Sequence, residues 1–344
     1  DSYGSRGLGD VYKRQDVYNQ VVDGERKSVN IYGRCGNPNE YQFEEQMIMI
    51  EGADACLATA SGMAAISVAL FGLLKSGDHI VCDWTTYSST HEMLDHRLTD
   101  YGIETTFVDT SDLESVKNAI NENTKVLYFE SIANPSMKVP DFDALVDIAH
   151  SNNIVVVCDN TFASPYVIRP LDWGVDIVIE SATKFIGGHN DALGGVIAMK
   201  SNLLPPDFME QIRWNTMVKW GSPLSPFNAW VLLRGIQTLP VRLERQCKTA
   251  MVLAEHFSSH DKIKRVWYPG LDSHPQHELA KKQMPKFGGM LTFEVDNGDD
   301  DNRGTIVDDV DERKNEYDDY FNDDAMTTSY DDDDEDEGIN TMNR

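Results

Sequence analysis

Short apolar segments that alternate with amphipathic segments constrain the fold of this chain more than any other feature. From about residue 52, runs rich in Val and Ile recur, and each ends near an acidic residue or a turn; they span residues 79–83, 103–109, 125–130, 154–159, 175–180 and 194–199. Strands without polar alternation are typical of parallel sheets that helices cover on both faces. The sequence therefore predicts an α/β fold with a mostly parallel central sheet.

The segments between these runs have helical spacing. Residues 141–150 are the clearest case, because four apolar side chains fall on one face: Phe142, Leu145, Val146 and Ala149. Residues 111–120 show the same pattern. In such sheets ligands bind at the carboxyl ends of the strands. Polar residues at those ends are therefore candidates for a functional site, namely Asp83, Glu130, Asp159 and residues 181–184.

The pattern changes in the second half of the chain. Residues 206–260 read as helical, and residues 263–268 and 289–295 read as short strands. This change predicts a second, α+β domain that begins near residue 236 and is truncated after residue 295. Residues 296–344 then hold 20 Asp and Glu against four Lys and Arg. Because blocks of like charge repel and stay unfolded, we expect an acidic disordered tail, with recruitment of a basic partner as the alternative.

Composition narrows the class of protein. The net charge of −27 comes without a basic stripe, so nucleic acid is not expected as a partner. Residues 1–15 start without Met and lack any periodicity, which favours a non-native leader. Residues 55–74 carry no charge and are long enough to cross a bilayer, but they are only weakly apolar. We expect a strand, a turn and a helix there, and no membrane segment.

The five cysteines show no C-x-x-C pair and no regular spacing. This arrangement indicates neither a disulfide framework nor a zinc site, and no other metal site is expected. Free cysteines are typical of a reducing compartment, so the cytoplasm is the expected location.

A lysine and an acid at the ends of two apolar runs carry the strongest functional signal. Lys184 follows the run at 175–180, and Asp159 ends the run at 154–159. A desolvated lysine can lose its proton and attack a carbonyl group, and a buried acid suits the protonated nitrogen of a pyridine ring. Lys184 alone could equally be a surface lysine, and Asp159 could hold magnesium in a nucleotide-binding protein. The chain contains no G-x-x-x-x-G-K-[ST] loop, which excludes the nucleotide alternative.

Three other segments add groups that a planar phosphorylated cofactor needs. Ser61 and Gly62 open a helix whose N-terminus is suited to an anion. Tyr87 follows a strand end and could stack on a ring, and Glu130 and Asn134 leave another strand before a turn. Each of these has a structural explanation as well: a capped helix, a packing tyrosine and a turn asparagine. Together with Lys184 they match the order that a vitamin B6 enzyme requires.

Residues 16–295 resemble the Cys/Met-metabolism family of pyridoxal-phosphate (PLP) enzymes, which includes methionine γ-lyase, cystathionine γ-lyase, cystathionine γ-synthase and O-acetylhomoserine sulfhydrylase. The matching motifs occur in the order of the family: Tyr32-Gly-Arg34 with Asn37-Pro38, Ser61-Gly-Met63, Glu130-Ser-x-Ala-Asn-Pro135, Asp159-Asn-Thr161, Ser181-Ala-Thr-Lys184 and Leu233-Arg-Gly-Ile-x-Thr-Leu239. The resemblance implies an aspartate-aminotransferase-like fold of type I. It implies an N-terminal arm at 16–36, a PLP-binding domain at 37–235 and the start of a C-terminal domain at 236–295.

The resemblance also implies roles for the matching residues. Lys184 would bind pyridoxal 5′-phosphate covalently and move protons, Asp159 would keep the pyridine nitrogen protonated, and Tyr87 would stack on the ring and assist the leaving group. Further cofactor-binding residues would be Ser61, Gly62, Met63, Asn134, Ser181 and Thr183. Tyr32 and Arg34 would reach the phosphate in a neighbouring subunit, which implies a homodimer or a homotetramer.

The substrate is less constrained. Relatives that handle cystathionine carry an arginine five residues after the stacking tyrosine, whereas this chain has Glu92, which favours an uncharged side chain such as that of methionine. Methionine γ-lyases often have cysteine two residues after that tyrosine, where this chain has Ser89. The family's Ser-Leu-Gly segment and carboxylate-binding arginine have no counterpart in residues 296–344. We therefore expect a complete cofactor half and an incomplete substrate half.

Three hypotheses follow. The first is γ-elimination on a small sulfur amino acid, of the methionine γ-lyase type. The second keeps the same chemistry but lets sulfide or a thiol replace the leaving group, as in O-acetylhomoserine sulfhydrylase or cystathionine γ-synthase, with cystathionine γ-lyase in the same trans-sulfuration group. The third is a catalytically silent PLP-binding assembly protein.

Overall fold

The computed structural model of the chain describes residues 32–296. The predicted leader at 1–15 and the acidic tail beyond residue 296 lie outside the described residues. The strands are β1 (Ala55–Thr59), β2 (His79–Asp83), β3 (Glu104–Val108), β4 (Thr124–Glu130), β5 (Val155–Asp159), β6 (Ile177–Glu180), β7 (Gly195–Met199), β8 (Ile263–Trp267) and β9 (Thr292–Val295).

The longer helices are α2 (Pro38–Glu51), α3 (Gly62–Leu73), α6 (Leu113–Ala119), α7 (Phe142–Ser151), α11 (Pro226–Ile236), α12 (Leu239–Ser258) and α13 (His277–Gln283). Two further helical stretches contain a π-helical turn. One joins α4 (Ser88–Glu92), η2 (Met93–Arg97) and α5 (Leu98–Asp100), and the other joins α9 (Phe208–Ile212), η4 (Arg213–Met217) and α10 (Val218–Trp220). Short helices occur at η1 (Gly33–Cys35), α8 (Ser164–Val167) and η3 (Pro170–Trp173).

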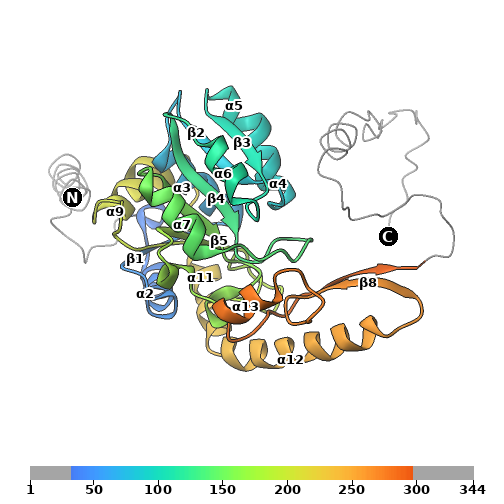
Figure 1. The fold of residues 1–344 in the computed structure, drawn as a ribbon. Coiled ribbons are helices and arrows are strands. Elements are labelled where there is room, and N and C mark those ends of the chain that lie inside the picture. Colours follow the sequence, from blue (N-terminus) through green and yellow to red (C-terminus); the bar gives the residue numbers. More distant parts are fainter. Residues whose placement is uncertain (1–31, 297–344) are drawn as a thin grey trace, which may run out of the picture. The chain divides into compact units, whose positions relative to one another are not determined.

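Seven strands form one central sheet in the order β1-β7-β6-β5-β4-β2-β3 (Figure 1). The strands from β6 to β3 pair in parallel, and β7 runs antiparallel to both β1 and β6. The mostly parallel sheet is thus confirmed, and the bounds predicted for the strands at 79–199 agree with the observed ones to within two residues. The strand predicted at 289–295 is shorter and begins at Thr292. The apolar pattern of residues 194–199 gave no indication that this strand runs in the opposite direction.

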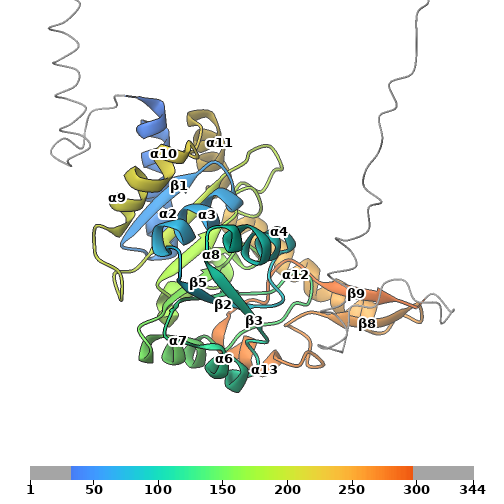
Figure 2. The same cartoon turned by 90° about the horizontal axis from the view of Figure 1, so that it is seen from above.

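Both faces of the sheet are covered, which explains the lack of polar alternation in its strands. Along β5, Val156 and Cys158 belong to the core that includes residues of α2, α7 and α11, whereas Val157 faces the core formed with α3 and α9. Figure 2 shows helices on either side of the strands. The apolar side chains on both faces of β5 therefore pack against apolar partners.

The charge-free stretch at 55–74 forms a strand and a helix, as its composition predicts. It contains β1 and α3, and the Ser61 hydroxyl caps α3 by accepting a hydrogen bond from the Ala64 N–H group at 3.1 Å. Within residues 32–296, no helix combines the length and the apolar character that a membrane span requires.

The region that follows α11 has the helical and strand character that its sequence predicts. The long helix α12 is followed by β8 and β9, which pair antiparallel, and α13 lies between these two strands in the sequence (Figure 1). Ala250, Ala254 and Tyr268 form a small core of their own. The domain boundary near residue 236 stays a prediction.

A buried ion cluster joins α2 to the second π-helical stretch. Arg213 lies 3.2 Å from Glu40 and 2.6 Å from Glu44, and all three side chains are almost fully buried. Burial, together with the neighbouring Glu44, raises the pKa of Glu40 to about 8. Arg213 therefore neutralises charge that the apolar surroundings would otherwise disfavour.

Replacing Arg213 by methionine should lower the free energy of unfolding by about 3–5 kcal/mol, because two carboxyl groups would stay buried without their cation. Urea denaturation of the variant measures this loss. Lys117→Met is the matched control, since Lys117 pairs with Glu114 on the exposed surface of α6, and it should change stability by less than about 1 kcal/mol. Equal losses in the two variants would contradict the role assigned to Arg213.

Candidate active site

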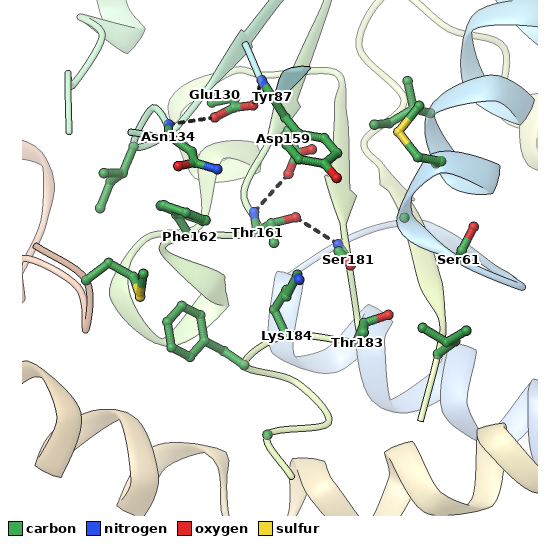
Figure 3. A pocket seen from close by; sticks show the side chains of 18 of the residues that line it. Ser61, Tyr87, Glu130, Asn134, Asp159, Thr161, Phe162, Ser181, Thr183 and Lys184 are labelled. Carbon is green, nitrogen blue, oxygen red and sulfur yellow. Dashed lines mark hydrogen bonds between the residues drawn. The ribbon is translucent and has the colours of Figure 1, made fainter. Parts of the chain in front are cut away.

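A cavity of about 720 Å³ lies at the carboxyl ends of β4, β5 and β6 (Figure 3). It brings together nine of the residues predicted to bind the cofactor, namely Ser61, Gly62, Met63, Tyr87, Asn134, Asp159, Ser181, Thr183 and Lys184. They come from five separate segments of the chain. The rule that ligands bind where parallel strands end therefore locates this cavity correctly.

Asp159 is the last residue of β5 and lines the cavity. Its Oδ1 atom accepts a hydrogen bond from the Thr161 N–H group at 3.0 Å, and the Tyr128 hydroxyl lies 3.5 Å from Oδ2. Burial raises the pKa of the Asp159 carboxyl, and these two donors oppose the increase. Among the described residues none forms an ion pair with Asp159. A cationic group in the cavity would therefore stabilise the carboxylate, as the protonated nitrogen of a pyridine ring would.

Lys184 lies in the turn that follows β6, and its backbone N–H group donates to the Ser181 carbonyl at 3.0 Å. The loop that carries it is closed at its base. The Thr183 hydroxyl oxygen lies 3.3 Å from the Gly194 carbonyl oxygen, and the Gly194 N–H group donates to that hydroxyl at 3.2 Å. The desolvation expected for Lys184 is not found, because its side chain is exposed where the cavity opens to solvent.

A cradle for an anion forms where α3 meets the segment after β6. A methyl group added at Gly62 would lie only 2.8 Å from the Ser181 Cβ atom, so the two backbones approach more closely than any side chain would permit. The hydroxyl groups of Ser61, Ser181 and Thr183 and the N-terminus of the twelve-residue helix α3 surround this position. Such a donor set fits a phosphate group.

Glu130 connects the two segments that carry Tyr87 and Asn134. Its Oε1 atom accepts a hydrogen bond from the Tyr87 N–H group at 2.7 Å, and Oε2 accepts one from the Asn134 N–H group at 3.1 Å (Figure 3). Burial and the nearby Asp159 raise the pKa of the Glu130 carboxyl. Tyr87 itself stays partly exposed, as a ring that faces a ligand should.

Thr161 links the end of β5 to the segment after β6 through hydrogen bonds. Its hydroxyl oxygen accepts a hydrogen bond from the Ser181 N–H group at 2.8 Å, while its own N–H group binds Asp159 (Figure 3). Thr161 belongs to the motif at 159–161, but the motif alone assigns no role to it. Its position two residues after Asp159 was the available signal, because a short polar residue at that spacing often bonds back to a strand end.

Several apolar or weakly polar lining residues were missed altogether, namely Ile132, Phe162, Phe185, Leu193, Gln246 and Met290. Phe162 and Phe185 are neighbours of predicted site residues, so proximity in sequence could have suggested them. Gln246 and Met290 come from α12 and from the segment before β9, and no local pattern marks them.

Other predicted residues do not line this cavity. Tyr32 and Arg34 are exposed, and the Arg34 guanidinium donates to the Val218 carbonyl at 2.5 Å. Ser89 and Glu92, which served to discriminate between substrates, lie in α4 outside the lining. In residues 32–296, no group of three or more His, Cys, Asp or Glu side chains could hold a metal ion. All five cysteines are free and buried.

Comparison with known proteins identifies related sequences. The family model described as "Cys/Met metabolism PLP-dependent enzyme" matches residues 10–311. An L-methionine gamma-lyase of Fusobacterium nucleatum subsp. polymorphum is 46% identical over 270 residues, which cover 78% of this chain and 67% of that protein. The cystathionine beta-lyase MetC of Bacillus subtilis (strain 168) is 43% identical over 265 residues, or 77% of this chain and 66% of the relative. The chain thus spans about two thirds of the length of these relatives.

Solved structures have the same fold. The crystal structure of metB from Corynebacterium glutamicum matches with a TM-score of 0.75 and 39% identity, over 78% of this chain and 69% of that one. The cystathionine gamma-lyase from Lactobacillus plantarum, crystallised with L-serine, matches with a TM-score of 0.75 and 37% identity, over 79% and 71% of the two chains. The type I fold expected from the sequence motifs agrees with these neighbours.

Proposed function

The chain belongs to the Cys/Met metabolism PLP-dependent enzyme family, and from this membership we propose that it cleaves the carbon–sulfur bond at Cγ of L-methionine or a similar uncharged sulfur amino acid. The cavity that gathers Lys184, Asp159, Tyr87 and the Ser61–Gly62 turn is the observation that supports this proposal. Several of the similar proteins are L-methionine gamma-lyases, at 39–46% identity.

The residues of the cavity fit pyridoxal phosphate. The close approach of Gly62 and Ser181 leaves room for an anion among hydroxyl groups, and Asp159 is a half-buried acid without a cationic partner in the described residues. Ser61, Gly62, Met63, Ser181 and Thr183 would hold the phosphate, Asn134 and Tyr87 would lie against the ring, and Asp159 would bind its nitrogen. Lys184 would provide the amine for covalent attachment.

Pyridoxal phosphate, when bound, supplies an electron-withdrawing ring that stabilises negative charge next to the Cα atom of an amino acid. The chain supplies the groups that move protons. We assign to the Lys184 amine the transfer of protons at Cα and Cβ, because no other amine occurs among the described residues that line the cavity. The Tyr87 hydroxyl would hold a proton for the departing thiol. The Asp159 carboxylate would keep the ring nitrogen protonated.

The lining supports a substrate with an uncharged side chain. Phe162, Phe185 and Met290 provide apolar surface, and Lys184 carries the one positive charge among the described lining residues. A second carboxylate, as in cystathionine, would find no cation there, so it would lose hydration without compensation. Glu92 lies outside the lining, so the apolar lining residues, and not Glu92, favour an uncharged side chain.

We also propose a homo-oligomer in the cytoplasm, a dimer or a tetramer. Tyr32 and Arg34 are exposed and lie outside the cavity of their own chain. In a dimer they would reach the phosphate of the neighbouring subunit, where the guanidinium could bind two oxygens together. The buried free cysteines are compatible with a reducing compartment.

The activity can be tested with the full chain and pyridoxal phosphate. L-methionine and water should yield methanethiol, ammonia and 2-oxobutanoate, and the rate of keto-acid release should not depend on added sulfide. L-cystathionine should react more slowly than L-methionine. O-acetylhomoserine with sulfide serves as the comparison, because a replacement enzyme would consume it without releasing keto acid.

Other outcomes would change the assignment. Sulfide-dependent consumption of O-acetylhomoserine at a higher rate than methionine cleavage would identify a replacement enzyme. Full occupancy by pyridoxal phosphate without turnover of any of these amino acids would identify a silent PLP-binding protein.

A further inference from the structure

Two side chains hold the segment after β2, one at the end of β4 and one on the segment that follows β4. The first is Glu130, whose two carboxyl oxygens each accept one backbone N–H group, from Tyr87 and from Asn134. It is 8% exposed and stands opposite Asp159 in the register of β4 and β5. Both of its acceptor atoms are therefore occupied by the chain itself, and neither needs a ligand to satisfy it.

The second is Lys138, eight residues further along. Its ammonium group lies 2.7 Å from Asp83, the last residue of β2, and 2.9 Å from Asp109, which follows β3. The Lys138 side chain is 11% exposed and that of Asp83 4% exposed. Asp83 also accepts hydrogen bonds from the N–H groups of Thr85 and Thr110. This cluster fixes the base of the segment that leads to Tyr87.

Together these contacts bind the same two segments at two places. Lys138 attaches the end of the segment after β4 to the start of residues 84–87, and Glu130 attaches the start of that segment to their end. The strands β2 and β4 are neighbours in the sheet, so both segments leave the same edge side by side. Relative movement of the segments would break contacts of both Glu130 and Lys138.

We propose that Glu130 and Lys138 are positioning residues that form a two-point clamp and hold Tyr87 and Asn134 in register against the cofactor. The inference rests on the proposed function, because it concerns the face of the cavity that receives the ring. Tyr87 is partly exposed, and apart from the backbone bonds at 87–91 its described hydrogen bond is the one to Glu130. A stacking ring needs such a fixed backbone, since small misplacements of catalytic groups are costly.

The first test measures the clamp without any cofactor. In the full chain, Glu130→Gln keeps the shape of the side chain but offers only one acceptor oxygen, so one of the two N–H groups loses its partner. Hydrogen exchange, followed by mass spectrometry on peptides covering 84–88 and 131–138, should become roughly tenfold faster in one or both. Lys138→Met should act on the same two peptides. Glu114→Gln and Lys117→Met are matched controls on the exposed pair of α6, and they should leave both peptides unchanged.

The second test measures the consequence for the site. Titration with pyridoxal 5′-phosphate should show affinity about tenfold weaker in Glu130→Gln, and Lys138→Arg, which keeps the charge, should stay within about twofold of the original chain. Because the clamp acts through Tyr87 and Asn134, adding Glu130→Gln to a chain that carries Tyr87→Ala and Asn134→Ala should weaken binding by no more than about twofold. A loss of affinity that arises elsewhere in the chain would instead be the same with or without these two substitutions.

The outcomes separate this inference from the proposed function. An original chain that does not bind pyridoxal phosphate would overturn the function, while the exchange measurement would still decide on the clamp. A chain that binds the cofactor, with unchanged exchange and affinity in Glu130→Gln, would overturn the clamp alone. Effects that add in the background of Tyr87→Ala and Asn134→Ala would overturn it as well. Should Glu130→Gln fail to fold, Glu130→Asp gives the same test, because it keeps the charge but is too short to reach both N–H groups.

Discussion

Replacing Lys184 by alanine should lower the rate of keto-acid release from L-methionine by about 10³-fold or more, because the cavity would lose both its covalent attachment point and its mobile base. The yellow colour that pyridoxal phosphate gains on bonding to a lysine should disappear at the same time. Absorbance spectroscopy and a keto-acid assay on the purified variant check the two effects. The phosphate cradle is intact in this variant, so the cofactor should still bind reversibly.

Lys184→Arg separates the loss of the positive charge from the loss of an amine that can be deprotonated. Arginine keeps the positive charge but is not deprotonated in proteins, so this variant should be as inactive as Lys184→Ala. Lys117→Ala, on the exposed surface of α6, controls for the loss of any lysine and should retain full activity. Persistence of the yellow colour in Lys184→Ala would assign the covalent bond to a different lysine.

Replacing Asp159 by asparagine should lower kcat for methionine cleavage by roughly 10²–10³-fold, because a neutral amide cannot keep the ring nitrogen protonated. The amide has nearly the same shape, so the hydrogen bond from the Thr161 N–H group can remain. The measurement is kcat at saturating pyridoxal phosphate, which separates catalysis from cofactor loss.

Asp147→Asn is the control for Asp159→Asn. Asp147 lies on the exposed face of α7 and does not line the cavity, so kcat should be unchanged. An Asp159→Asn variant that retains the original kcat at full occupancy would show that another group protonates the ring.

The sequence predicted the sheet well because each strand is short and apolar and ends at an acidic residue or a turn. Asp159 and Glu130 end neighbouring parallel strands in register, so a rule about strand ends places both at one site. The anion cradle was predictable for a similar reason, since Ser61 and Gly62 interrupt a charge-free stretch at the point where β1 gives way to α3. At these positions the residue types seen in the sequence and the order of the strands lead to the same site.

Other features depend on contacts that no local pattern encodes. Gln246 and Met290 reach the cavity from α12 and from the segment before β9, and only tertiary packing brings them there. The exposure of Lys184 depends on the openness of the cavity rather than on its neighbours in sequence. The direction of β7 likewise follows from how the chain returns to the sheet, because an apolar run reads the same in both directions.

The antiparallel direction of β7 has a consequence for how such a protein can diversify. Because β7 starts at the edge where β6 ends, the loop at 183–194 leaves and re-enters the sheet on the same side, and bonds between Thr183 and Gly194 close it. Lys184 lies next to that closure, whereas Asn190, in the middle of the loop, lines the cavity and is exposed. Substitutions at Asn190 can therefore accumulate during evolution without displacing the lysine, which lets the choice of substrate change while the chemistry is kept.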